Sequence, residues 1–441
     1  MSTTPSLGKR TVVNLFFGIF LQAMIALAFD SGGIVSGTIA SVAMNTQQIK
    51  WILLLYGPLL AARGDIAVLA GKLGTGLHLG TVKPTFRKNT PVYKSLVAST
   101  LTIAMLDAFL VGIVTYVMNL ITFPADLKVY DPTLFFVIPI IVMAIVALIS
   151  VQITSAVSFF VYKRGLNPDV YVIPVMSTVN NILITSVFAG VLAILKPWDS
   201  ENLVPIGDKD FFGVAHGNKM IGTYITIIPA ILVLVGIMYI IMKNRKDHEY
   251  RKMMREALFA VFASAIIGTI TGVTLSKGEA ALEAYPQLLV AFPALIGTLV
   301  DQNAITANML ITDFSAGYVE PELKSIKKPR VWTKFAGIAA GGAVITILLS
   351  LIGTFIKWGE IREHQDTLKF TLAATIFLIM FITLLANFLG YILVGGLIYV
   401  LSIVAFKKEI DPDNFAIPLT ACLADLACAG FIIIFASAIL L

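Results

Sequence analysis

The sequence contains little charge and almost no cysteine. Asp, Glu, Lys and Arg make up only 13% of the 441 residues, whereas 58% of the residues are hydrophobic and the mean hydropathy is +0.89. This shortage of charge excludes a soluble globular protein. The two cysteines, Cys422 and Cys428, both lie in the last apolar segment, so the sequence offers neither a disulfide framework nor a cysteine zinc motif.

The sequence also lacks the motifs of most catalytic classes. No phosphate-binding loop or nucleophile motif supports ATP-driven pumping. An intramembrane aspartyl protease would need two aspartates brought together. Asp65 and Asp301 are the candidate pair, but no Gly-x-Gly-Asp motif is present. We therefore expect no enzymatic activity and no cofactor. The histidines are scattered over different loops and helix ends, which excludes an imidazole-rich site for a soft metal: His78, His216, His248 and His364.

Long apolar runs are abundant and predict a polytopic membrane protein. As a helix, about 20 apolar residues suffice to cross the hydrocarbon core. The residue pattern shows no short alternating strands, and unsatisfied backbone groups exclude loops exposed to lipid, so we predict an all-α bundle. We expect about eleven transmembrane helices, near residues 11–30, 49–79, 95–122, 133–162, 170–196, 219–242, 256–275, 285–312, 333–356, 370–400 and 414–441.

Lysine and arginine gather in every second loop between the apolar segments. The formal net charge of +6 therefore reflects the orientation signal of a membrane protein, and we expect no nucleic-acid partner. Loops rich in Lys and Arg face the cytoplasm, whereas the intervening loops here are acidic or mixed. We predict a multi-pass protein of the cell membrane, embedded in the lipid bilayer, with a cytoplasmic N-terminus and an extracellular C-terminus.

Two short sequence patterns occur twice in the chain and indicate an internal duplication. Residues 167–169 and 411–413 each lead, at the same spacing, to a proline within an apolar segment. We predict two five-helix repeats, residues 1–200 and 251–441, joined by a linking helix within residues 201–250. Because both of these loops lie beside basic residues, the repeats are expected to be parallel, related by an axis along the membrane normal. The matched positions are Pro58 with Pro293, Asp65 with Asp301, Pro174 with Pro418 and Asn181 with Asp425.

Aspartates at membrane depth are the strongest candidates for function, because charge is costly there and marks pathways or binding sites. We predict that Asp425 lines a cation route, since no Lys or Arg in the central part of its own span neutralises it. Asp65 and Asp301 are predicted to do the same from matched places in the two repeats. Asp313 lies late in its helix, where a vestibule charge that attracts cations competes with simple solvation.

Structural roles stay open for these acids. Asp425 is alternatively a protonated, hydrogen-bonded core acid. Asp65 and Asp301 are alternatively paired with Arg63 or a nearby amide. Two further aspartates have no matching acid in the other repeat and are as well explained by a helix-terminal position: Asp30 and Asp107.

A run of motifs begins with Pro58, Gly64-Asp65, residues 69–75 and Gly80, and continues with residues 167–169 and Pro174. In this order and spacing the motifs resemble the transmembrane domain of MgtE-type magnesium transporters. The second copy shows a similar pattern and keeps an aspartate in its final helix. The order and spacing of these motifs are closer still to the solute-carrier relatives of MgtE, in which two such domains are fused in one chain.

The resemblance implies a five-helix fold whose two copies enclose a central route for hydrated divalent cations. The final-helix aspartate of the family, which faces a magnesium ion, falls on Asp425 and on Asn181. Where the family usually shows Gly-Asn, this chain has Gly64-Asp65 and Val300-Asp301. The implied metal-facing residues are thus Asp65, Asn181, Asp301, Asp313 and Asp425. Because one chain supplies both copies, a monomer is expected to suffice, with further oligomerisation left open.

We therefore predict a transporter of divalent cations, with Mg²⁺ as the preferred ion. Magnesium dehydrates reluctantly and usually keeps several waters, so a few carboxylates and carbonyls suffice to bind it. A secondary transporter of another cation or of a small solute is the alternative. An anionic solute would want an arginine at the midplane, for which Arg63 is the sole candidate. Channel and cation-coupled exchanger are not separated by the sequence.

Overall fold

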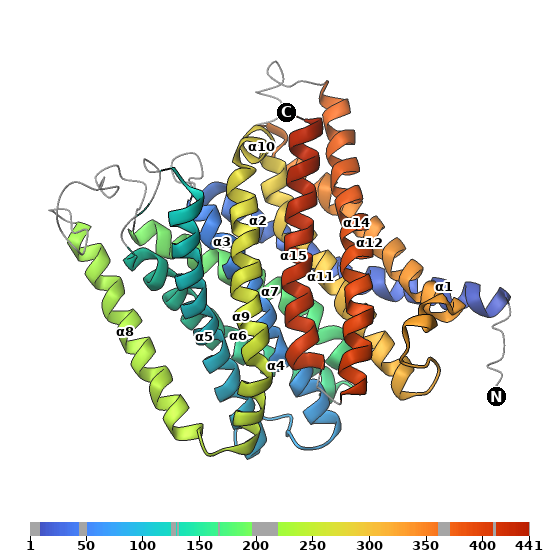
Figure 1. The fold of residues 1–441 in the computed structure, drawn as a ribbon, viewed down its shortest axis with the longest axis horizontal. Helices are drawn as coiled ribbons and strands as arrows, with labels where there is room; N and C mark the ends of the chain where they lie inside the picture. Colours follow the sequence, from blue (N-terminus) through green and yellow to red (C-terminus); the bar gives the residue numbers. More distant parts are fainter. Residues whose placement is uncertain are drawn as a thin grey trace.

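The computed structural model describes residues 9–43, 51–124, 129, 132–165, 168–195, 219–359, 371–408 and 412–440. Over these ranges the chain forms helices and no strand, as Figure 1 shows. The prediction of an all-α polytopic membrane protein is confirmed. The helices are α1 (Lys9–Leu27), η1 (Ala28–Gly32), α2 (Gly33–Ala43), α3 (Trp51–Ala61), α4 (Arg63–His78), α5 (Pro91–Thr122), α6 (Thr133–Lys163), α7 (Pro168–Leu195), α8 (Lys219–Asn244), α9 (His248–Lys277), α10 (Glu279–Ala284), α11 (Pro286–Ser315), η3 (Leu323–Lys327), α12 (Pro329–Ile356), α14 (Leu372–Lys407) and α15 (Pro412–Ile439).

Ten helical segments in these described ranges are long and apolar enough to cross a membrane. The first of them runs through α1, η1 and α2 as one span, Val12–Ala43. The expected span at 49–79 is not among the ten, because it consists of two shorter helices, α3 and α4, that meet at Ala62. Helix α3 is wholly buried and apolar, whereas α4 carries the charged residues Arg63, Asp65 and Lys72.

The basic loops share one end of the bundle. In Figure 1 the connection from α4 to α5, that from α8 to α9 and the lower ends of α14 and α15 all lie at the bottom. The C-terminus lies at the opposite end, beside α10. These three places lie on one side of the bundle, and the prediction that this side faces the cytoplasm stays a prediction.

The first helix of each predicted repeat packs against the other repeat. Helix α1 lies against α12, and α2 packs against α11 and α7. In the matching way, α9 lies against α5 and packs against α3 and α15. With the predicted division of the chain, the two repeats interlock through their first helices, and both contribute to the centre of the bundle.

Glycines allow these first helices to approach their partners closely. A Cβ at Gly268 would lie 2.8 Å from Cα of Pro58, and one at Gly33 would lie 2.6 Å from Cα of Ala294, the residue after Pro293. Real Cβ atoms do not come so close to backbone, so the crossings require glycine. The matched prolines Pro58 and Pro293 thus mark the places where the first helix of the other repeat crosses.

The helices differ sharply in how deeply they lie within the bundle. Helix α11 is buried along most of its length and contacts α2, α12, α14 and α15. Helix α8, the predicted linking helix, lies at the edge in Figure 1 and exposes apolar side chains such as Ile231, Leu232 and Val235. An exposed apolar helix is stable at this position only in contact with lipid.

Candidate functional site

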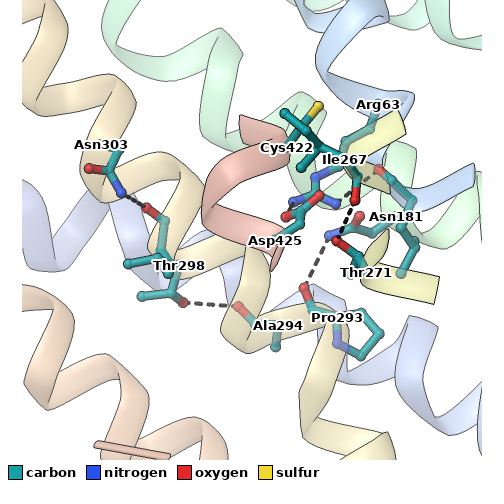
Figure 2. A network of polar contacts seen from close by, with 12 residues as sticks. Arg63, Asn181, Ile267, Thr271, Pro293, Ala294, Thr298, Asn303, Cys422 and Asp425 are labelled. Atoms are coloured by element: carbon teal, nitrogen blue, oxygen red, sulfur yellow. Dashed lines mark hydrogen bonds and ion pairs between the residues drawn. The ribbon is translucent and has the colours of Figure 1, made fainter. Parts of the chain in front are cut away.

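Arg63 and Asp425 form an ion pair in the middle of the bundle. Arg63, at the start of α4, donates from Nη2 to Oδ1 of Asp425 in α15, at 2.6 Å. Its Nη1 donates to the carbonyl oxygen of Leu60 at 2.9 Å. The two charged side chains are only 3% and 2% exposed. Arg63 belongs to the first repeat and Asp425 to the second, so the pair bridges the repeats, which the close view in Figure 2 shows.

Asn181 holds the matched position on α7 and has a different partner. Its Nδ2 donates to the carbonyl oxygen of Pro293 in α11 at 3.3 Å. In Figure 2 the side chains of Asn181, Arg63 and Asp425 lie close together, and Pro293 is beside them. The Asn181 amide is thus fixed against the second repeat by a backbone carbonyl.

A second pair of carboxyl groups lies beside Asn181. Asp30 is buried in η1, at the break between α1 and α2. Its carboxyl group interacts with the carboxyl group of Asp301 and with the charge of Arg63. A Cβ placed on Gly297, one turn before Asp301 on α11, would lie 3.2 Å from Oδ1 of Asp30 and 3.7 Å from Nδ2 of Asn181. Asp30, Asn181 and Asp301 therefore converge on the same face of α11.

Several oxygen atoms of this cluster are buried without a hydrogen bond of good geometry, although Asp30 and Asp301 lie close to each other. Among the residues that the structure describes, these atoms are Oδ1 and Oδ2 of Asp30, Oδ1 of Asn181, Oδ2 of Asp301 and Oδ2 of Asp425. Buried polar oxygens without partners are costly and call for a specific explanation. Carboxylate and amide oxygens are the ligands of hard cations such as Mg²⁺. No group of three or more His, Cys, Asp or Glu side chains is arranged as a ready metal cage in the described ranges.

A hydroxyl network ties α7 to the neighbouring helices behind Asn181. Ser36 in α2 donates to the backbone oxygen of Asn181 at 3.0 Å and lies 2.5 Å from the hydroxyl of Thr185. Tyr56 in α3 lies 3.0 Å from the same hydroxyl. The network fixes the segment of α7 that presents Asn181, and the sequence analysis did not identify it.

Asp313 lies apart from the central cluster and has two cationic partners. It is roughly three turns, about 18 Å, further along α11 than Asp301. Arg330 approaches its Oδ1 at 3.0 Å and Lys334 its Oδ2 at 2.6 Å, both from the first turns of α12. The carboxylate is 2% exposed. In this conformation Asp313 fastens α11 to α12, and its vestibule role stays a prediction.

Asp65 falls in α4, two residues after Arg63, but its side chain lies outside the described residues. The prediction that it shares an axis with Asp301 stays a prediction. Of the remaining predicted residues, the structure brings Asn181, Asp301 and Asp425 together. It adds Arg63, the predicted candidate counter-ion of an anionic solute, and Asp30, for which a helix-terminal role was an equal alternative.

A helical membrane bundle whose two halves converge on buried carboxylate and amide oxygens has the features of a membrane transport protein for cations. A family model described as MgtE, divalent cation transporter, matches residues 57–191 and 292–437, together more than half of the chain. The chain belongs to the MgtE family of divalent cation transporters, and it is therefore a transporter and not an enzyme. No match was found among curated proteins or among solved structures.

Proposed function

We propose that the protein carries Mg²⁺ across the cell membrane along a route between its two repeats, at the cluster of Asp30, Asn181, Asp301 and Asp425. The observation that carries this proposal is the convergence of buried carboxylate and amide groups from both repeats on one place, where several of their oxygen atoms have no hydrogen bond of good geometry among the described residues. The Arg63–Asp425 and Asn181–Pro293 contacts both join one repeat to the other at this point. A repeat interface is where transporters of this architecture place their substrate.

The donor atoms favour magnesium over softer metals. They are carboxylate and amide oxygens, and Mg²⁺ binds through a few such ligands while keeping several of its waters. A site of this kind attracts a divalent ion yet lets it leave, because the ion is not enclosed by a complete protein cage. Mg²⁺ is the transported ion here, and no cofactor is needed for the proposed activity.

The remaining predicted residues are assigned to the ends of this route. Asp65 is proposed to line it from α4, two residues beyond Arg63. Asp313 is proposed to draw cations toward the end of the bundle with the basic loops, when its ion pairs with Arg330 and Lys334 open. That end is proposed to face the cytoplasm, with the N-terminus inside and the C-terminus outside. A single chain contains both repeats and therefore a complete route.

The alternative, secondary transport of another solute, is less well supported by the contacts of Arg63. An anionic solute would need the guanidinium group as its counter-ion. Arg63 instead donates to Asp425 and to the carbonyl of Leu60, so its charge is already matched by a carboxylate. The cluster as a whole has more carboxylates than cations and therefore favours a cationic substrate.

Growth of a host strain that lacks its own magnesium uptake tests the proposal. The wild-type chain should restore growth at low Mg²⁺, and Asp425→Asn and Asp301→Asn should not, at equal amounts of protein in the membrane. Lys328→Gln is the matched control, because it removes a charge from an ion pair with Glu320 whose side chains are 33% and 75% exposed. Full complementation by both aspartate variants would exclude the cluster from the mechanism.

A further inference from the structure

Arg63 places a positive charge where a transported cation would bind. Its Nη2 lies 2.6 Å from Oδ1 of Asp425, the final-helix carboxylate at the centre of the proposed route. Both side chains are almost completely buried, so water does not screen the pair. A divalent ion that binds Asp425 therefore meets a carboxylate that already has a cation.

Comparison of the two repeats shows that Arg63 and Asp425 occur as a pair. In the second repeat the position matched to Arg63 is Leu299, two residues before Asp301 as Arg63 is two residues before Asp65. The final-helix residue that would face it is Asn181. One half of the cluster thus has both members of a charge pair, and the other half has neither. If Arg63 served only to pack α4 against its neighbours, there would be no reason for this charge matching.

The pair is incompletely satisfied, which makes it exchangeable. Arg63 contacts one oxygen of Asp425, while Oδ2 of Asp425 and Nε of Arg63 are buried with no hydrogen-bond partner among the described residues. A bidentate arginine–carboxylate pair would satisfy both oxygens and would be harder to open. The carboxyl groups of Asp30 and Asp301 lie near enough for their charges to interact with Arg63, so they offer the guanidinium a second set of acceptors.

We propose that Arg63 is a tethered competitor of the transported ion: its guanidinium occupies Asp425 when no metal is bound there and must leave when a divalent cation binds. This inference rests on the proposed function. Two cations next to one buried carboxylate repel each other, so metal binding and the ion pair exclude one another. While the metal is on Asp425, Arg63 turns toward Asp30 and Asp301. Its return to Asp425 then releases the ion.

Removing the competitor should tighten metal binding and slow release. In Arg63→Gln, Asp425 loses its internal cation, so we expect the affinity for Mn²⁺, used as a paramagnetic probe, to rise about tenfold or more. Transport should show a lower KM together with a lower maximal rate, because nothing displaces the bound ion. A merely structural role would lower the amount of folded protein and would not produce this split.

A double-mutant cycle on the full-length chain in nanodiscs tests the inference, with Mn²⁺ binding followed by electron paramagnetic resonance. The four proteins are wild type, Arg63→Gln, Asp425→Asn and the double variant, with Lys328→Gln as the control. The expected gain in affinity appears only when Asp425 is present. An equal effect of Arg63→Gln in both backgrounds, or weaker binding with Asp425 present, would overturn the inference.

Free guanidinium gives a second readout that does not depend on the folding of one variant. It should weaken Mn²⁺ binding to Arg63→Ala, by taking the vacated place on Asp425, and should leave wild type and Arg63→Ala/Asp425→Asn unchanged. No effect of guanidinium on Arg63→Ala contradicts the competitor role. Failure of the proposed function is distinguished by flux, since wild-type liposomes would then carry no Mg²⁺ whatever the variants bind.

Discussion

Asn181 and Asp425 hold matched positions in α7 and α15, yet each contacts the opposite repeat in a different way. Asn181 donates to the backbone oxygen of Pro293 at 3.3 Å, whereas Asp425 accepts from the side chain of Arg63 at 2.6 Å. The site is therefore chemically asymmetric within a pseudo-symmetric bundle. The Asp425 side chain is charged and paired with a cation, whereas the Asn181 side chain is neutral and bonded to a backbone carbonyl.

Asn181→Asp places a carboxylate at the neutral position that matches Asp425. It adds an unpaired buried charge beside Asp30 and Asp301 and removes the donor to Pro293, so the protein without metal should be less stable. Mg²⁺ should offset this loss, giving a larger metal-induced rise in Tm than in wild type. Asn180→Asp is the control, since Asn180 accepts from Ser150 at 2.6 Å. Equal metal-induced shifts in both variants and in wild type would contradict the assignment of Asn181.

Asp30→Asn should weaken divalent binding although Asp30 has no counterpart in the second repeat. Loss of this buried carboxylate from the cluster should reduce the affinity for Mg²⁺ by about tenfold, which corresponds to about 1.4 kcal/mol. Isothermal titration of the protein in nanodiscs measures this. Glu249→Gln, an exposed acid near His248, is the control. Unchanged affinity in Asp30→Asn would place this residue outside the route.

Asp313→Asn is expected to destabilise the contact between α11 and α12. The substitution leaves Arg330 and Lys334 without their shared carboxylate, and the side chain of Lys334 is only 10% exposed. Because Arg330 is partly solvated, we expect a loss of about 2 kcal/mol rather than the full cost of breaking a buried pair. Thermal unfolding in detergent measures it. An unaltered Tm combined with a raised KM for Mg²⁺ would favour the vestibule role alone.

Gly272→Ala should disturb the crossing of the two repeats. A Cβ at this position would overlap the carbonyl oxygen of Leu54 in α3, so the helices must move apart, at a cost of about 1 to 3 kcal/mol. Gly236→Ala in α8 is the matched control, because a Cβ there meets no atom within 4 Å. Lower Tm in the first variant only is the expected outcome. Equal Tm values would show that the crossing tolerates a larger separation.

Residues next to the basic loops after α6 and α14 should be accessible from one side of the membrane. Single cysteines at Lys163 and Lys407, introduced after replacing the buried Cys422 and Cys428, are expected to react with an impermeant reagent only from the cytoplasmic side. This expectation follows from the predicted parallel arrangement of the two repeats. Labelling of the two positions from opposite sides would refute it.

Composition and hydrophobic runs were sufficient to predict the fold class, because a bilayer permits few ways to satisfy a buried backbone. The matched prolines were also informative, since Pro58 and Pro293 lie at equivalent helix crossings in the structure. The partner of Asp425 could not be predicted in the same way. Arg63 is 362 residues away in sequence, and the two meet only because the repeats interlock.

The sequence left Asp30 undecided between a functional and a helix-terminal role for a different reason. Comparison of the repeats selects residues that recur, and Asp30 stands where the second repeat has no acid. Its position in η1, just before the glycines that cross α11, was the available signal. For Asp313 the sequence did not distinguish between two roles, because a charge near a helix end is typical both of a vestibule residue and of an ion pair. Its contacts with Arg330 and Lys334 in α12 became known only from the structure.

Flux into proteoliposomes tests the central claim most directly. Purified wild-type protein, Asp425→Asn and Asp301→Asn are reconstituted at equal density, and the internal Mg²⁺ is followed with an enclosed indicator under gradients of Mg²⁺, Mn²⁺ or Na⁺. We predict Mg²⁺ entry with the wild type and Lys328→Gln and a loss of at least tenfold with either aspartate variant. Wild-type liposomes that carry no Mg²⁺, or aspartate variants that carry it at the wild-type rate, would contradict a magnesium route between the repeats.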